Sequence, residues 1–153
     1  MRISIDNFEL NFKRNNDGEW WAIFTLNTSQ CEVTFDEKVF QNKPDEELTI
    51  NWNCIEEAIK DLINNFDTLM YKSKSALIAL HQQIFDNEFL DKKGYFDFSG
   101  IEIVEYNTQG HRYAIDLCFS LHSHLLFVMD ELCYNSNFKK QPYGLILSNV
   151  RRE

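Results

Sequence analysis

The residues of this chain that could carry out chemistry gather around a His-x-His pair, His122 and His124. In a strand, residues two apart point to the same side, so both imidazoles could reach one metal ion. Asp116 and Cys118 precede the pair with the same alternation and could complete a set of ligands. The pair stands at the end of a predicted strand, however, and the other ligand types stand at no recognised metal spacing. We therefore predict no bound metal and no cofactor, and keep as an alternative a small hydrolase or ligand-binding enzyme with its site near His122 and His124.

The cysteines offer no better nucleophile. A thiol–histidine pair needs a lowered thiol pKa and a third group that orients the base, and the sequence shows neither. The chain also lacks a G-x-S-x-G motif and a glycine-rich phosphate loop. The cysteines are widely spaced and form no CxxC pair, which favours unbridged, buried thiols in a reducing compartment; they are Cys31, Cys54, Cys118 and Cys133. The sequence thus predicts no catalytic residue.

The acidic residues indicate binding instead. The formal net charge of −9 argues against a nucleic-acid partner, which requires Lys and Arg to contact phosphates, and against an anionic membrane surface. Acids are concentrated between Glu32 and Asp61, and the polar segment from Asp36 to Leu48 is typical of a loop. Such a loop would present negative charge to a basic protein partner. The partner-binding acids predicted there are Asp36, Glu37, Asp45, Glu46 and Glu47.

Two adjacent tryptophans, Trp20 and Trp21, extend this binding hypothesis. Successive residues of a strand face opposite ways, so one ring enters the core and the other can be exposed. An exposed tryptophan beside an acidic loop has the composition of a binding hot spot, and we assign that role to Trp21. The alternative is that helices, or the aromatic connection at Tyr95–Phe98, cover this ring.

The elements that position these residues begin with a β-meander in the first third of the chain. Alternating apolar residues predict strands over Ile3–Phe12, Trp20–Leu26 and Cys31–Phe35. A change of phase at Asp6-Asn7 predicts a β-bulge within the first of them. Asn15-Asn16-Asp17-Gly18 is a strong turn signal, because these residues tolerate positive φ.

The middle third predicts a helical segment over Asn53–Asp86, with Asn53 as its N-cap. Apolar residues recur there at steps of three and four. The stripe weakens at Tyr71–Ser75, so either one bent helix or two helices fit the pattern.

The last third returns to strands, predicted over Ile101–Tyr106, Tyr113–Ser120, Leu125–Asp130 and Tyr143–Val150. Strands grouped on either side of a helical segment favour an α+β fold: an antiparallel sheet with the helices packed on one face. A length of 153 residues fits a single domain, residues 1–153. The predicted core includes Ile59, Leu62, Ile63, Phe66, Leu69, Ile115, Leu117 and Phe119.

The second half of the chain resembles the small α+β immunity proteins that are encoded beside bacterial polymorphic or contact-dependent toxins. The resemblance lies in the strand Tyr113–Phe119, the later strand at Tyr143–Leu147 and the central helix, together with size, acidity and aromatic content. It implies a non-enzymatic protein that binds and occludes a toxin, and a basic toxin would suit the acidic chain. No motif carries functional positions across.

A third hypothesis is a scaffold or homodimerisation domain that packs exposed aromatic residues between two copies. The segment Met1–Phe12 lacks the apolar stretch of a signal peptide, and the longest apolar runs fall far short of the roughly 20 residues that cross a bilayer. We therefore expect a cytoplasmic protein.

Overall fold

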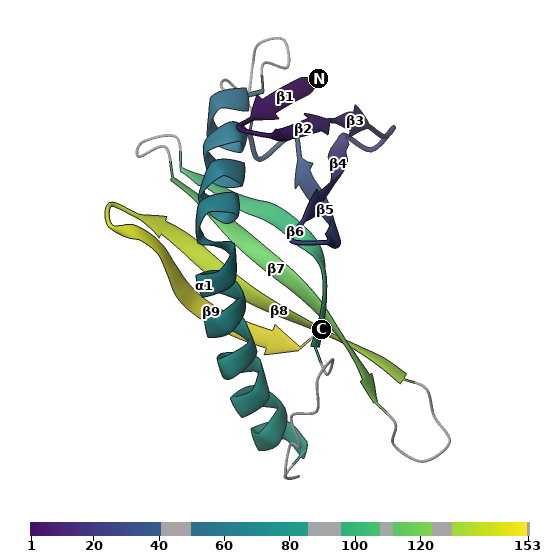
Figure 1. Ribbon diagram of the computed structural model, residues 1–153, viewed down its shortest axis with the longest axis vertical. Helices are drawn as coiled ribbons and strands as arrows, with labels where there is room; N and C mark the ends of the chain where they lie inside the picture. The colour runs from purple at the N-terminus through teal and green to yellow at the C-terminus, as the bar shows by residue number, and fades with distance from the viewer. Residues whose placement is uncertain (41–49, 86–95, 108–111, 124–129, 153) are drawn as a thin grey trace.

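The computed structural model describes residues 1–40, 50–85, 96–107, 112–123 and 130–152 (Figure 1). Within them the chain forms nine strands and one helix, which confirms the α+β class. The elements are β1 (Arg2–Ile5), β2 (Phe8–Asn11), β3 (Lys13–Arg14), β4 (Glu19–Leu26), β5 (Ser29–Asp36), α1 (Trp52–Phe85), β6 (Phe96–Asn107), β7 (Arg112–Ser123), β8 (Asp130–Gln141) and β9 (Gly144–Arg152).

Seven of the strands form one sheet in the order β3-β4-β5-β6-β7-β8-β9. Its neighbours pair antiparallel except β5 and β6, which are parallel. The prediction of an antiparallel sheet is therefore wrong at this one pair. Parallel neighbours need a crossover connection, and α1 is the helix between β5 and β6 that returns the chain to the same end of the sheet.

The strands β1 and β2 form a separate hairpin rather than one bulged strand. The chain reverses at Asp6-Asn7, with Ile5 opposite Phe8, and Asp6 has a φ of 50°. The predicted β-bulge is therefore wrong. A two-residue reversal explains the same change of phase, because it pairs odd-numbered Ile3 with even-numbered Leu10 and buries both side chains on one side.

The helical segment is one continuous helix of 34 residues. Its N-cap is Asn51, whose Oδ1 accepts a hydrogen bond from the Cys54 amide at 3.2 Å, so the prediction of Asn53 is wrong by two residues. The earlier start follows from the Trp52 ring, which packs 5.6 Å from the ring centroids of both Phe12 and Phe35. Within the described residues, no helix has an apolar stretch long enough to cross a bilayer.

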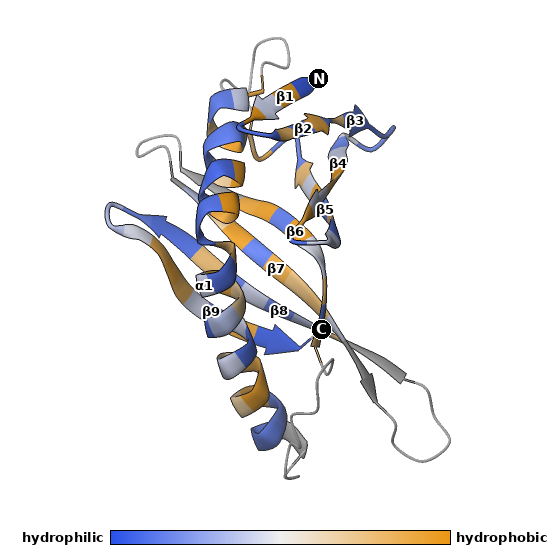
Figure 2. Ribbon diagram, in the orientation of Figure 1, coloured by the Kyte–Doolittle hydropathy of each residue, from blue (hydrophilic) through white to orange (hydrophobic). Residues whose placement is uncertain are grey.

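The apolar stripe of α1 packs into a core shared with the strands. Figure 2 shows hydrophobic positions recurring along α1 and in the middle strands of the sheet. All of the predicted core side chains are buried except Ile63, which is half-buried; the buried ones are Ile59, Leu62, Phe66, Leu69, Ile115, Leu117 and Phe119.

Polar contacts also join α1 to β8. Ser73 and Ser136 share a hydrogen bond of 2.7 Å between their hydroxyls, and both residues are buried. Further along the helix, His81 Nδ1 lies 2.7 Å from the Tyr134 hydroxyl, and near its start Lys140 Nζ lies 2.5 Å from Asp61 Oδ2. These bonds fix the position of α1 along β8, while the finer prediction that the helices pack on one face of the sheet stays a prediction.

The strand β8 is the largest departure from the predicted elements. The sequence predicts a strand over residues 125–130 and none over the following ten, yet β8 begins at Asp130 and continues to Gln141. Residues 125–129 lie outside the described part. Asn is depleted in strands, yet Asn135, Ser136 and Asn137 are buried within β8. Neighbouring elements supply polar partners for two of them, Ser73 for Ser136 and Asp116 for Asn137.

Candidate functional site

The acidic segment after β5 does not present all of its charge to solvent. Glu37 is 5% exposed, and Arg14 donates to both of its carboxylate oxygens at 2.7 Å. Trp20 Nε1 donates a third bond at 3.0 Å. The exposed position expected for Glu37 is therefore wrong, because three donors from β3 and β4 draw its carboxylate into the fold.

The other predicted acids divide between the surface and the part of the chain that the structure leaves undescribed. Asp36 is exposed, and its Oδ1 accepts the Lys38 amide at 2.9 Å. Asp45, Glu46 and Glu47 lie outside the described residues. Of the five predicted acids, Asp36 is the one that the structure places at the surface.

The ion pair between Glu37 and Arg14 predicts an acid-sensitive fold. The bonds from Arg14, helped by the bond from Trp20, lower the pKa of Glu37 from 4.5 to about 2 against the opposing effect of burial. Because the folded-state pKa lies below that of the unfolded chain, the carboxylate stabilises the fold fully above about pH 4.5 and loses this effect as pH falls towards 2. We expect thermal unfolding, followed by circular dichroism, to show a steeper loss over this window in the wild type than in Glu37→Gln. Parallel pH profiles for the two proteins would contradict this role.

Trp20 and Trp21 face opposite sides of β4. Trp20 packs among core aromatics, with its ring centroid 5.0 Å from that of Trp52. Trp21 is half-buried on the other side of the sheet, and the Lys13 ammonium lies 5.3 Å from its ring centroid. The face that carries Trp21 is the one whose side chains alternate away from α1.

Strand register places Trp21 in a line of side chains across this face. Trp21 stands opposite Thr34, Thr34 opposite Glu102, Glu102 opposite Asp116, and Asp116 opposite Asn137. Asn137 in turn stands opposite Asn149 on β9. We call these six residues the lateral row; they run from β4 to β9.

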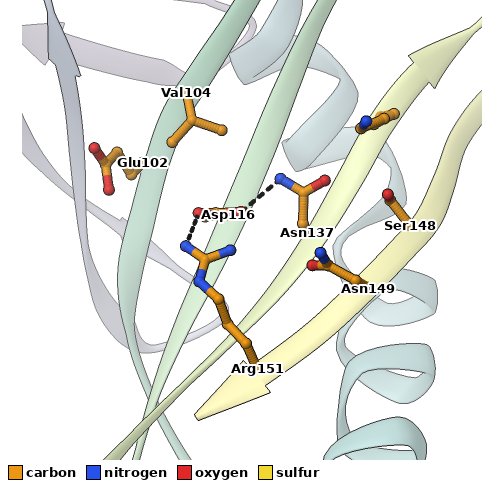
Figure 3. A pocket seen from close by; sticks show the side chains of 8 residues that line it. Glu102, Val104, Asp116, Asn137, Ser148, Asn149 and Arg151 are labelled. Atoms are coloured by element: carbon orange, nitrogen blue, oxygen red, sulfur yellow. Dashed lines mark hydrogen bonds and ion pairs between the residues drawn. The ribbon is translucent and has the colours of Figure 1, made fainter. Parts of the chain in front are cut away.

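A polar hollow of about 340 Å³ lies where the lateral row crosses β6 to β9. Asp116 forms its floor and is 1% exposed. Asn137 Nδ2 donates to Asp116 Oδ1 at 2.6 Å, and Arg151 donates to Oδ2 at 2.6 Å, from the two sides seen in Figure 3. The Asp116 carboxylate is thus held in place by two donors, and the hollow around it is lined by Glu102, Ser148 and Asn149 among others.

The bonds to Asp116 limit the chemistry that this carboxylate can perform. Asp116 already accepts bonds from an amide and a guanidinium, so it is poorly placed to act as a base. In the described ranges, no three His, Cys, Asp or Glu residues gather closely enough to hold a metal ion. His122 lies on β7 and His124 falls outside those ranges, so the enzyme hypothesis at this pair stays a hypothesis.

The four cysteines are free thiols. Cys31 and Cys54 are buried as expected, whereas Cys118 is half-buried and Cys133 exposed. Burial raises the pKa of Cys31 to about 12 and that of Cys54 to about 11, so neither is a thiolate at neutral pH. These two thiols therefore cannot serve as activated nucleophiles.

The sequence did not reveal the hollow. The sequence indicates Asp116 only as a possible metal ligand, although an acid inside the apolar run of β7 signals a buried partner. That partner, Arg151, stands 35 residues later on β9, and its relation to Asp116 depends on the register of three strands. Comparison of the chain with protein-family models, curated proteins and solved structures finds no match.

Proposed function

We propose that this chain is a non-enzymatic, cytoplasmic protein-binding domain that contacts a basic partner through the sheet face carrying the lateral row, as an immunity-type inhibitor would. The observation that carries the proposal is the row itself. It aligns a half-buried tryptophan, exposed Glu102 and a preorganised polar hollow on one face of the sheet. Preorganised groups lower the cost of binding, because they are already ordered in the free protein.

The charge of this face favours a basic partner on the side of β4 to β6. Glu19 stands directly opposite Asp36, and Glu102 directly opposite Asp116. Arg151 already compensates Asp116. Glu19 and Asp36 are like charges in opposed positions, which destabilise a sheet, so a partner that brings Lys or Arg beside them would relieve repulsion. Exposed Glu32 lies on the same face, on β5, two residues before Thr34 of the lateral row. The cations of the hollow, Lys139 and Arg151, lie on the far side, on β8 and β9.

Apolar groups within this acidic region supply an anchor. Trp21 is half-buried, and Ile23, two residues further along β4, is 44% exposed opposite Glu32. Aromatic and aliphatic anchors surrounded by polar groups are typical of the centres of protein interfaces. The predicted role of Trp21 therefore remains part of the proposal. The acidic residues proposed to act with it are those of the lateral row rather than Glu37.

Charge reversal on this face tests the proposal. The immobilised chain would capture its partner from an extract of its own cells, and association of the identified partner would then be measured by biolayer interferometry. We expect the double variant Glu32→Lys, Glu102→Lys to associate about tenfold or more slowly at low salt, because electrostatic steering is reversed. The difference should shrink as salt rises, since the Debye length falls to about 8 Å at physiological ionic strength.

The matched control is a double reversal on α1, Glu57→Lys with Glu56→Lys, which changes the net charge equally at a distance from the lateral row. An equal slowing in both variants would show that net charge alone governs association. Unchanged rates in the sheet variant, or failure to capture a basic protein, would also refute the proposed face. Trp21→Ala should raise the dissociation rate if the ring is the anchor.

A further inference from the structure

Two hollows adjoin on the face of the sheet that carries the lateral row. The polar hollow shares Lys139 and Ser148 with a second hollow of about 310 Å³, which reaches the turn between β8 and β9. Lys139 follows Asn137 by two residues on β8, so both hollows open on the same face. The apolar side chains that line the second hollow are those of Pro142, Tyr143 and Ile146. We call the two hollows together the trough; it has a polar end and an apolar end.

The charges that line the polar end cancel. Its lining contains two acids and two bases, which are Glu102, Asp116, Lys139 and Arg151. Asp116 and Arg151 form an ion pair of 2.6 Å, although the whole chain carries a net charge of −9. An ionic ligand would gain little net attraction here and would compete with this pair, and separating a buried carboxylate from its partner is costly. The polar end therefore favours a neutral ligand.

The polar end presents both hydrogen-bond donors and acceptors. Asn137 donates to Asp116 through Nδ2, which leaves its Oδ1 as an acceptor. Ser148 and Asn149 are exposed on β9, and Figure 3 shows them across the hollow from Asp116. Within the described part of the chain, the side chains of Ser148 and Asn149 make no hydrogen bond. A ligand with several hydroxyl groups matches this set, because each hydroxyl both donates and accepts.

The apolar end adds a surface against which a ring can pack. Tyr143 is 98% exposed in the turn between β8 and β9, and Ile146 is 52% exposed. Pro142 has a fixed φ, which limits the backbone entropy that this turn can lose on binding. A sugar ring carries hydroxyls around its edge and C–H groups on its faces. It can therefore form hydrogen bonds at one end of the trough and pack against an aromatic ring at the other, whereas a purely apolar ligand suits one end only.

We propose that the trough binds a neutral oligosaccharide. The hydroxyls of one ring bind Asn137, Ser148 and Asn149, and the C–H face of the next ring packs against Tyr143. The proposed protein interface has its anchor and its acids on β4 to β6, at the other end of the lateral row. The inference goes beyond the proposed function and does not depend on it.

Titration of the isotope-labelled chain with neutral disaccharides, followed by NMR, tests the proposal. The probes are maltose, cellobiose and N,N′-diacetylchitobiose, with glucuronate and glucosamine as charged relatives. We expect a neutral probe to shift the amide resonances of β8 and β9 around the trough. The dissociation constant should be on the order of 1 mM, because an open trough covers only part of the ligand. The charged relatives should bind more weakly.

Variants of the two ends separate their contributions. Tyr143→Ser should weaken binding about tenfold, because the contact with the aromatic ring is lost. Asn149→Ala should weaken it about fivefold through the loss of a hydrogen bond. Both side chains are exposed, so the fold should remain intact. The matched control is Tyr71→Ser on α1, which removes a ring that is 75% exposed and should leave binding unchanged.

The absence of shifts with all three neutral probes would overturn the proposal. So would tighter binding of glucuronate or glucosamine, or equal affinities of Tyr143→Ser and the wild type. If a captured protein partner shifted these amides and the saccharides did not, the trough would belong to a protein interface instead. Failure to capture a basic protein would count against the proposed function alone, because the saccharide titration uses no partner.

Discussion

Leu62→Ala should lower the free energy of unfolding by about 2–5 kcal/mol. The Leu62 side chain is completely buried on the core-facing stripe of α1, so its removal leaves a cavity between the helix and the strands. Urea unfolding measures the change as a lower midpoint with an unaltered slope. Tyr71→Ala on the same helix is the control, because that ring is 75% exposed and its loss should cost less than about 0.5 kcal/mol.

Equal losses in the two variants would mean that packing of Leu62 against the sheet does not govern the stability of α1. Alanine favours a helix in both positions, so propensity alone predicts no loss at all. A loss below about 1 kcal/mol for Leu62→Ala would place its side chain outside the cooperative core.

Gly100→Ala is expected to cost about 1–3 kcal/mol through steric conflict at the parallel pair. A Cβ atom on Gly100 would lie 2.7 Å from the backbone oxygen of Glu32, the residue opposite it on β5. A backbone atom in a ladder cannot swing away as a side chain can, so β5 and β6 must separate. Hydrogen exchange should then show faster exchange in these two strands than elsewhere.

Gly144→Ala separates this steric effect from backbone strain. Gly144 has a φ of 124°, but nothing lies within 4 Å of the position of its Cβ. Alanine there should cost roughly 1 kcal/mol through its conformation and leave exchange in β5 and β6 unchanged. If Gly100→Ala were as stable as the wild type, the close approach of β5 and β6 would be wrong.

Local patterns in the sequence predicted the elements whose cause is local. The three- and four-residue spacing around Leu62 defines α1 without knowledge of its neighbours, and Asn15–Gly18 marks a turn by conformation alone. The strand β8 has no such signal, because a polar residue such as Asn137 occupies it only where another strand supplies its partner, here Asp116 of β7. The parallel contact of β5 with β6 is likewise a property of the whole chain, since neither strand differs in pattern from an antiparallel one.

The candidate site likewise contains residues whose positions follow from local patterns and residues whose positions depend on the whole fold. Trp21 could be placed on a face from its position beside Trp20, because alternation is a local rule. Glu37 could not be placed, since its direction is set by Arg14, 23 residues earlier in the chain. Asp116 and Arg151 lie still further apart, so the hollow emerges only when the register of β7, β8 and β9 is known.

The parallel pairing of β5 with β6 also determines the order in which parts of the chain can fold during synthesis on the ribosome. Val33 is opposite Ile101, so roughly 70 residues must be translated between one partner and the other. At about 5–20 residues per second, β5 waits several seconds with one side open, while α1 emerges with its apolar stripe uncovered. The nascent amino-terminal half therefore depends on the carboxy-terminal strands for its core. A ribosome that stalls before β6 would release a fragment prone to aggregation.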